Sequence, residues 1–245
     1  MGLLTDLIDT LPGDAPVSAV CVGAFWTAVW SRHCGLASTL GAADHEHGAV
    51  FVADAGHLHD RSARELAQLA HSSRLLEAGI GLAAINSLLE VDLTRCVELN
   101  AGRFLIDHAP GKRIALVGHF PFVPELRRVA QRLWVIDLHP APGDLSPAEG
   151  DTVIGQADLV AITGCALINH TMEGLLEKCR PDALVLVLGP TAPLSPVLFD
   201  HGVDVICGTR VADPEAALHS VAQGAVFRQV EGVQLLAMWR AGARP

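Results

Sequence analysis

The stretch Arg113–Val117 reads RIALV and leads directly into Gly118-His119, so a short apolar run ends at a glycine. The four residues after Arg113 are all apolar and do not alternate with polar ones. A continuous run of this length is typical of a strand covered on both faces, as in a parallel sheet. We therefore predict a buried strand here, with a glycine at its carboxyl end where backbone can approach a ligand.

The same pattern returns four times toward the C-terminus. Between these runs lie two stretches that are compatible with helices, Asn169–Cys179 and Pro214–Gln223. Strands that alternate with helices indicate βαβ units, and hence a Rossmann-like parallel sheet. The four further predicted strands are Leu133–Leu138, Asp158–Thr163, Ala183–Leu188 and Val203–Ile206.

The first half of the chain follows a different order. Val17–Trp30 is long and apolar and is interrupted at Gly23, which predicts two strands joined by a bend. Ala49–Ala53 is a further predicted strand, and two predicted helices follow, Arg61–Ala70 and Arg74–Leu89. Strands first and helices after indicate an α+β unit.

The boundary between the two units is expected near Pro110-Gly111, because proline and glycine interrupt helices. This point lies just before the RIALV strand. The predicted fold class is therefore α/β, with residues 1–108 forming an α+β domain and residues 109–245 a Rossmann-like parallel-sheet domain.

The composition excludes two classes of partner. The chain has 245 residues, half of them hydrophobic, and a formal net charge of −10. A nucleic-acid backbone would be repelled by this charge, so we expect no nucleic-acid partner. Every apolar stretch is interrupted before the roughly 20 residues that a bilayer requires, so we expect no membrane insertion. The apolar composition is compatible with a homodimer.

The N-terminus and the cysteines indicate a compartment. Met1–Leu11 carries Asp6 and Asp9 but no basic residue, unlike a secretory signal, and its apolar spacing predicts a short amphipathic helix. The six cysteines are widely spread and form no CxxC pair. We therefore expect reduced thiols in a soluble, cytoplasmic protein.

Unusual residues occur where the first two predicted strands of the second half end, which is where open parallel sheets bind ligands. Gly118 is followed by His119, whose ring can titrate. Asp137 follows about 20 residues later, where Rossmann proteins hold a ribose through an acidic side chain. A turn with a structural histidine and a solvated carboxylate are the alternatives. The absence of GxGxxG argues against an ordinary dinucleotide site.

The next two predicted strands end in similar loops. Thr163-Gly164 is followed by Asn169 and Thr171, either of which would cap a helix whose free N–H groups favour an anion. Helix capping without a ligand is the alternative interpretation. Gly189 begins a rigid loop that reads GPTAP, for which an ordinary turn is the alternative.

Four histidines in the first half could bind a metal ion. His45 and His47, and likewise His57 and His59, stand two residues apart next to carboxylates. On an extended strand each pair would share a face, and imidazole with carboxylate suits Zn, Ni, Cu or Fe. The spacing matches no established zinc signature, so exposed loop histidines are the alternative.

Several stretches, in order along nearly the whole chain, resemble the putative heavy-metal-chelation family, which began as a domain of unknown function. The resemblance implies an enolase-N-terminal-like domain followed by a Rossmann-like domain, with a cleft between them that looks like an active site. The stretches are Gly79–Asn86 (GIGLAAIN), Val117–Pro121 (VGHFP), Thr163-Gly164 with Asn169 and Thr171, and Gly189–Leu194 (GPTAPL) followed by Leu198-Phe199 and Gly202-Val203.

The resemblance also implies which residues line the cleft. One position departs from the family, because glutamate is expected at the end of the second Rossmann strand and this chain has Asp137. The histidine-rich loops are not a family pattern. The implied cleft residues are Asn86, Gly118, His119, Thr163, Gly164, Asn169, Thr171 and Gly189.

Three hypotheses about function follow, and the sequence leaves open whether the protein is an enzyme. The first is a metal-homeostasis protein that binds or processes a siderophore-, pterin- or flavin-like chelator in the cleft. The second is an enzyme of condensation, hydrolysis or S-adenosylmethionine-dependent transfer on a pterin- or nucleotide-like substrate. There His119 would be a general acid or base, Asn169 a further catalytic residue, and Asp137 would hold a ribose. The third is direct binding of a transition metal by His45, His47, His57 and His59.

Overall fold

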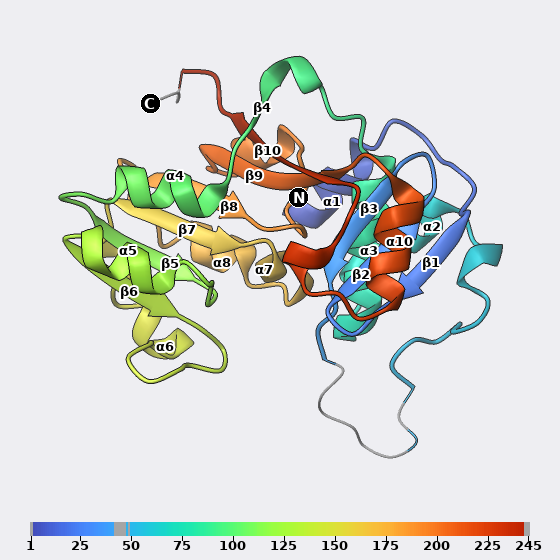
Figure 1. Ribbon diagram of the computed structural model, residues 1–245, viewed down its shortest axis with the longest axis horizontal. Coiled ribbons are helices and arrows are strands. Elements are labelled where there is room, and N and C mark those ends of the chain that lie inside the picture. The colour runs from blue at the N-terminus through green and yellow to red at the C-terminus, as the bar shows by residue number, and fades with distance from the viewer. Residues whose placement is uncertain (1, 42–47, 49, 243–245) are drawn as a thin grey trace.

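The larger sheet of the protein has seven strands. The computed structural model describes residues 2–41, 48 and 50–242. The strands are β4 (Cys96–Glu98), β5 (Arg113–Val117), β6 (Arg132–Ile136), β7 (Leu159–Thr163), β8 (Leu184–Leu188), β9 (Val205–Val211) and β10 (Val233–Trp239). Their order is β4-β10-β9-β8-β7-β5-β6 (Figure 1). The strands from β9 to β6 are parallel, whereas β10 and β4 are antiparallel to their neighbours.

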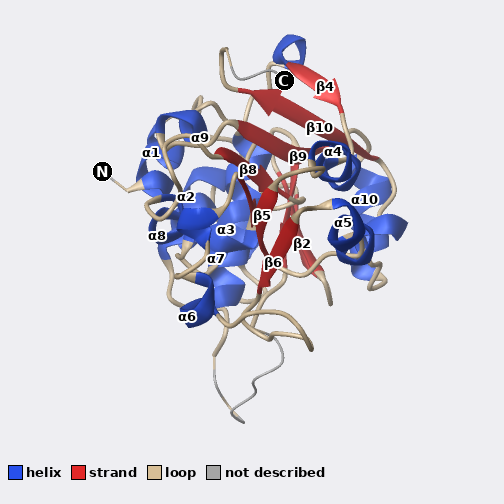
Figure 2. Cartoon of the chain, turned by 90° about the vertical axis from the view of Figure 1, so that its left-hand side faces the viewer, coloured by secondary structure: helices blue, strands red, loops and turns tan. Residues whose placement is uncertain are grey.

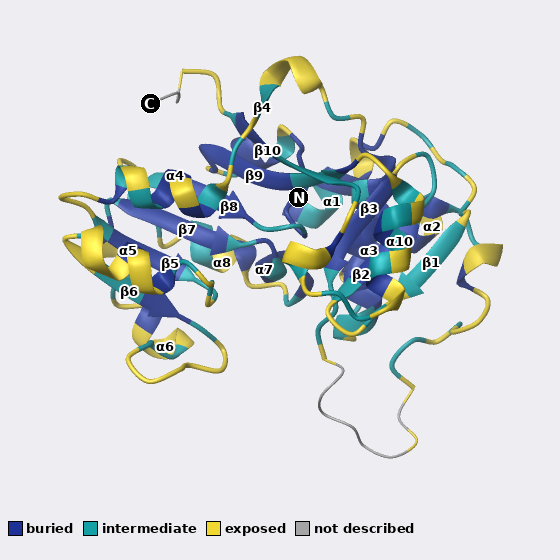
Figure 3. Ribbon diagram, in the orientation of Figure 1, coloured by how far each residue is buried: buried dark blue, intermediate teal, exposed yellow. Residues whose placement is uncertain are grey.

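The predicted parallel strands are confirmed, and their apolar runs reflect cover on both faces. Ile114 and Leu116 of β5 pack in one cluster with residues of α4 (Ala101–His108) and α5 (Val123–Val129). Ala115 belongs to the cluster on the opposite face, together with residues of α7 (Cys165–Ile168) and α8 (Met172–Leu176). Figure 2 shows the sheet between these two layers of helices, and Figure 3 shows that its central strands are buried.

β10 and β4 were not predicted from the sequence, and β9 extends further than the predicted fifth strand. β9 continues to Val211 because β10 pairs with its whole length, from Val233 opposite Val211 to Trp239 opposite Val205. β4 in turn pairs with β10. These antiparallel strands lie outside the βαβ repeat, so the pattern that revealed the others does not extend to them.

The smaller sheet is antiparallel and consists of β1 (Ala19–Val22), β2 (Trp26–Trp30) and β3 (Cys34–Ser38). The two strands predicted within Val17–Trp30 are therefore confirmed. One face of the sheet packs on α3 (Leu75–Leu88) and the other on α10 (Pro214–Ala222). Because α10 belongs to the second half of the chain, the two halves share a core.

The strand predicted at Ala49–Ala53 is wrong for its described residues, 50–53, none of which lies in a strand. The N–H of Ala53 donates to the carboxylate of Glu77 on α3 instead of to a neighbouring strand. The third strand is β3, whose sequence CGLAS has small residues and a glycine that weaken the usual signal for a strand.

The predicted helices are present but several are shorter than expected. The Arg61–Ala70 segment contains α2 (Ala63–Ala67), capped by Ser62 and Glu65, and then a 3-10 turn. The helix predicted over Asn169–Cys179 is α8 alone, because His170 has a φ of 59° and interrupts the helical backbone. The remaining helices are α1 (Leu3–Asp9), α6 (Pro147–Gly150) and α9 (Val197–Asp200).

Two glycines let α3 pack unusually closely. A Cβ on Gly35 of β3 would lie 2.1 Å from the carbonyl oxygen of Ala83, and one on Gly81 would lie 2.0 Å from the backbone nitrogen of Ala70. Real atoms do not approach so closely, so only glycine fits at either position. In the part of the chain that the structure describes, no helix is long and apolar enough to cross a membrane.

Candidate functional site

The parallel strands bring five loops to one edge of the larger sheet. The chain passes from β5 outward to β6, then crosses back to β7 and continues to β8 and β9. The direction of strand order therefore reverses between β5 and β7, which pair directly. At such a reversal the two following loops diverge, and open α/β sheets bind ligands in the resulting crevice.

Gly118 lies at this reversal and contacts Thr163. It follows β5 with a φ of 101°, a conformation that favours glycine. A Cβ on Gly118 would also lie 3.1 Å from both the Cβ of Thr163 and a ring carbon of Phe120. Glycine therefore suits this backbone conformation, and a Cβ here would crowd the side chains of Thr163 and Phe120.

Asn86 connects the smaller sheet to the loop that follows β8. Its side-chain Nδ2 donates to the carbonyl oxygens of Leu36 at 2.9 Å and Thr191 at 3.2 Å. Gly164 packs against the same loop, since a Cβ there would lie 2.6 Å from the nitrogen of Ala192. Gly189, with a φ of 108°, opens this loop. Four residues predicted from the sequence thus lie on one strip, which follows the loops after β5, β7 and β8. They are Asn86, Gly118, Thr163 and Gly164.

A cluster of hydroxyl and thiol groups lies on this strip and was missed by the sequence analysis. Thr191, which is 1% exposed, accepts a hydrogen bond from the backbone N–H of Ser38 at 2.9 Å. The hydroxyls of Ser38 and Thr191 are 3.1 Å apart, and the Cys165 thiol donates to the Ser38 hydroxyl at 3.1 Å. Ser38 ends β3, the strand that the sequence did not reveal, so its position could not be foreseen.

His119 is held by a buried carboxylate. Its Nδ1 lies 2.7 Å from Oδ2 of Asp144, whose side chain is only 1% exposed. The other oxygen of Asp144, Oδ1, lies 3.3 Å from Nη2 of Arg127 on α5. Asp144 lies in the loop after β6, and no local pattern in the sequence shows that this loop folds back toward His119.

Three other predicted residues make local contacts. Oδ1 of Asp137 accepts a hydrogen bond from the N–H of His139 at 2.8 Å at the end of β6. Oδ1 of Asn169 accepts one from the hydroxyl of Thr171 at 2.7 Å, just before α8. Between the latter two, His170 Nε2 lies 3.0 Å from the carbonyl oxygen of Ser72. A role in ligand binding for Asp137, Asn169 and Thr171 stays a prediction.

The predicted histidine metal site is only partly described. His57 and His59 lie at a 3-10 turn instead of on an extended strand, and both are within 3.5 Å of a carboxylate oxygen of Asp60. His45 and His47 lie outside the described residues. Among the described residues, no three His, Cys, Asp or Glu side chains gather closely enough to hold a metal ion. The four-histidine site stays a prediction.

A carboxyl group with a strongly lowered pKa lies at the amino ends of the parallel strands, opposite the reversal loops. Asp158 precedes β7 and accepts hydrogen bonds from Nε and the backbone N–H of Arg113, which hold its pKa well below the ordinary value. Arg180 also pairs with Asp158. This network ties together the amino ends of β5 and β7, which is a structural role.

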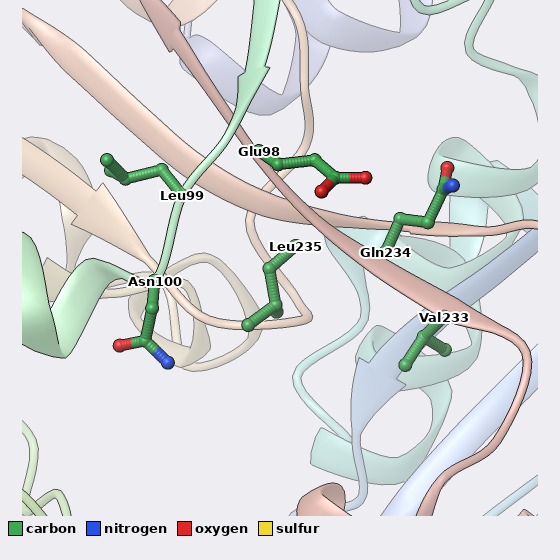
Figure 4. A pocket seen from close by; sticks show the side chains of 6 residues that line it. All are labelled: Glu98, Leu99, Asn100, Val233, Gln234 and Leu235. Carbon is green, nitrogen blue, oxygen red and sulfur yellow. The ribbon is translucent and has the colours of Figure 1, made fainter.

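Two hollows lie away from the reversal of strand order. One, of about 410 Å³, is lined by residues of β4 and β10, by Leu99 and by Asn100, the cap of α4 (Figure 4). The other, of about 330 Å³, lies between the ends of α1 and α3 and the start of α9. Neither includes Gly118, His119 or Thr163. These residues, predicted from the sequence, therefore lie at the reversal and not in either hollow.

Comparisons with solved structures show the same fold in two proteins of unknown function from the DUF364 family. A protein of Desulfitobacterium hafniense DCB-2 has a TM-score of 0.85 and 24% identity over 97% of this chain and 98% of its own. A protein of Pyrococcus horikoshii has a TM-score of 0.80 and 20% identity over the same shares.

The sequence comparisons cover both halves of the chain. An uncharacterised protein of Methanocaldococcus jannaschii is 27% identical over 168 residues, and the match spans 65% of this chain but only 64% of that protein. Residues 100–240 match a family model described as "Putative heavy-metal chelation", and residues 4–89 match a second model with the same description. The chain therefore belongs to the family described as putative heavy-metal chelation.

Proposed function

We propose that the protein acts in metal homeostasis by binding or processing a small chelator-like molecule, of siderophore, pterin or flavin type, at the carboxyl edge of the larger sheet. The contact between Gly118 and Thr163 at the reversal of strand order carries this proposal. The loops after β5 and β7 begin at this point, and open α/β sheets bind ligands where the strand order reverses. The family description supports a ligand that carries a metal.

The surrounding groups suit a polar ligand. Asn86 and the Ser38–Thr191–Cys165 cluster lie where the smaller sheet meets the loop after β8. His119 stands at the β5 side of the reversal, with nearly half of its side chain exposed. A ligand between them would contact both sheets, so that binding would depend on how the two halves of the chain are packed.

The test is native mass spectrometry of the protein purified gently from its own host. We expect a retained molecule of small mass, together with a metal ion, in the wild-type protein. His119→Gln should lower the retained fraction severalfold, because it removes an exposed polar group at the reversal. His33→Gln is the matched control, since His33 is an exposed histidine in the turn before β3. Equal retention in all three proteins would contradict the proposed location.

A second function, an enzyme that uses S-adenosylmethionine, is favoured by the position of Asp137. This carboxylate follows β6, the neighbour of β5, where nucleoside-binding α/β proteins place the acidic residue that contacts the ribose. The hydrogen bond from the N–H of His139 already orients one of its oxygens. His119 would then be the candidate general acid or base, and Asn169 a further candidate catalytic residue.

Thermal denaturation with S-adenosylmethionine or S-adenosylhomocysteine tests this second function. A ligand at 100 times its Kd stabilises the folded state by about 2.7 kcal/mol, which raises Tm by several degrees. We expect Asp137→Asn to reduce this increase in Tm, since it removes the carboxylate that would accept hydrogen bonds from the ribose hydroxyls. No increase in Tm with either compound in the wild-type protein would rule against the enzyme hypothesis.

A further inference from the structure

Asp144 is an unusual residue because its carboxylate is buried while both of its partners are exposed. Its side chain is 1% exposed, whereas those of His119 and Arg127 are 46% and 45% exposed. The backbone fixes its place, since Leu145 donates to Val135 and receives a hydrogen bond from the N–H of Asp137, which closes the loop after β6. The loop therefore places the carboxylate of Asp144 against the exposed ring of His119.

The two oxygens of Asp144 have different partners. Oδ2 lies 2.7 Å from Nδ1 of His119, and Oδ1 lies 3.3 Å from Nη2 of Arg127. Burying a carboxylate costs several kcal/mol unless charges and hydrogen bonds compensate for the lost water. Arg127 already supplies a balancing charge. The shorter hydrogen bond between Asp144 and His119 therefore does not require a charged ring. A neutral imidazole that carries its proton on Nδ1 can donate this bond.

This hydrogen bond decides which ring nitrogen is free. An ionised carboxylate only accepts hydrogen bonds, so the Nδ1 of His119 must carry the proton that is donated to Asp144. In the neutral ring the lone pair then lies on Nε2. Among the described residues, Nε2 has no hydrogen-bond partner, and His119 follows Gly118 at the reversal of strand order. A carboxylate behind an exposed imidazole is the arrangement that orients metal-binding histidines.

We propose that Asp144 is a positioning residue that holds His119 with Nε2 unprotonated, and that Nε2 takes an open coordination position on a divalent transition metal carried by a small chelator. The chelator supplies the other ligands, so one histidine suffices to dock the complex. The proposal rests on the proposed function for its ligand, but the state of the His119 ring does not depend on any ligand.

The first test is the tautomer of His119 in the metal-free protein, measured by 15N NMR of histidine-labelled protein and assigned with His119→Gln. At a pH where the ring is neutral, we expect a protonated Nδ1 and an unprotonated Nε2. In Asp144→Asn, Arg127 still donates to the amide oxygen, so the amide NH2 group faces His119. The ring must then accept at Nδ1, and its proton moves to Nε2. Arg127→Met should keep the wild-type tautomer.

The second test titrates the same labelled proteins with nickel–nitrilotriacetate, a chelated metal that still has open coordination positions. We expect selective broadening of the His119 signals in the wild-type protein. Asp144→Asn should require about 10–100 times more complex for the same broadening, as is typical when the carboxylate behind a metal-binding histidine is lost. The other histidines of the chain report non-specific binding in the same spectra, and equal Tm values exclude a folding effect.

The outcomes separate this proposal from the proposed function. If the wild-type ring is protonated at Nε2, or if Asp144→Asn leaves the tautomer unchanged, Asp144 does not position His119. If the tautomer changes as expected but nickel–nitrilotriacetate broadens His119 no more than the exposed histidines, the metal-docking role is wrong. In either case, a small molecule that stays bound to the protein purified from its own host would support the proposed function.

Discussion

Replacing Gly35 with alanine is expected to lower the free energy of unfolding by about 3 kcal/mol, near the upper end of the range for overpacked cores. The added Cβ would lie 2.1 Å from the oxygen of Ala83 and 2.4 Å from the nitrogen of Ser87. These are backbone atoms of α3, which cannot move away as a flexible side chain can. The gain of roughly 0.5–1 kcal/mol that alanine usually brings over glycine in a strand is too small to compensate.

The same substitution should disturb the candidate site. Gly35 precedes Leu36, whose carbonyl oxygen accepts a hydrogen bond from Asn86. If α3 moves away from β3, Asn86 can no longer hold both Leu36 and the loop at Thr191. Urea denaturation and ligand retention by native mass spectrometry measure the two effects.

Gly174→Ala is the matched control for Gly35→Ala. Gly174 lies in α8, has no neighbouring atoms where a Cβ would be, and does not have a positive φ. Alanine there should be neutral or stabilise by up to about 1 kcal/mol, because it restricts the unfolded chain. If both variants unfold at the same urea concentration, close packing of α3 is not what requires glycine at position 35.

Glu77→Ala is expected to lower the free energy of unfolding by about 2–3 kcal/mol, because three donors would lose a buried, charged acceptor. Glu77 is 6% exposed and accepts hydrogen bonds from the Ser72 hydroxyl, the Ala53 N–H and the Arg74 guanidinium. These bonds attach Ala53 and Ser72 to the start of α3. Glu77→Gln keeps the shape of the side chain and should lower the free energy of unfolding by less than Glu77→Ala does.

Glu77 should also make stability depend on pH. Burial acts to raise the pKa of Glu77, but the hydrogen bonds from Ser72, Ala53 and Arg74 outweigh burial and lower it below the ordinary 4.5. A carboxyl group with a lowered folded-state pKa binds protons less well when folded. Its contribution to stability is therefore complete above pH 4.5 and is lost as the pH falls through the folded-state pKa.

Thermal denaturation across this pH range checks the sign. We expect the Tm of the wild-type protein to fall more steeply with acid than that of Glu77→Gln, so that the two curves approach each other below pH 4.5. The matched control is Glu90→Gln, because Glu90 is exposed and pairs only with Arg32 among the described residues. Parallel curves for the wild-type protein and Glu77→Gln would show that Glu77 titrates alike in the folded and unfolded chain.

Periodicity predicted the elements that are covered on both faces. The runs at β5, β7 and β8 are continuous and apolar because α4 and α5 cover one face and the core shared with α3 covers the other. β3 and β10 were missed for different reasons. β3 contains Gly35, a residue that is unusual in strands and is needed here because α3 packs directly against it. β10 is an antiparallel strand that follows the last βαβ unit.

The sequence by itself determined the parallel sheet, its glycine-ended strands and the position of His119 at a carboxyl end. Burial and backbone conformation leave a local pattern in the chain, and that pattern can be read. Only the tertiary structure decided which side chains meet. Asn86 reaches Thr191 across 105 residues, Ser38 reaches Thr191 across 153, and Asp144 reaches His119 across 25. Such contacts depend on how loops and sheets pack in three dimensions, and the periodicity of a segment records that it is buried but not which partner it contacts.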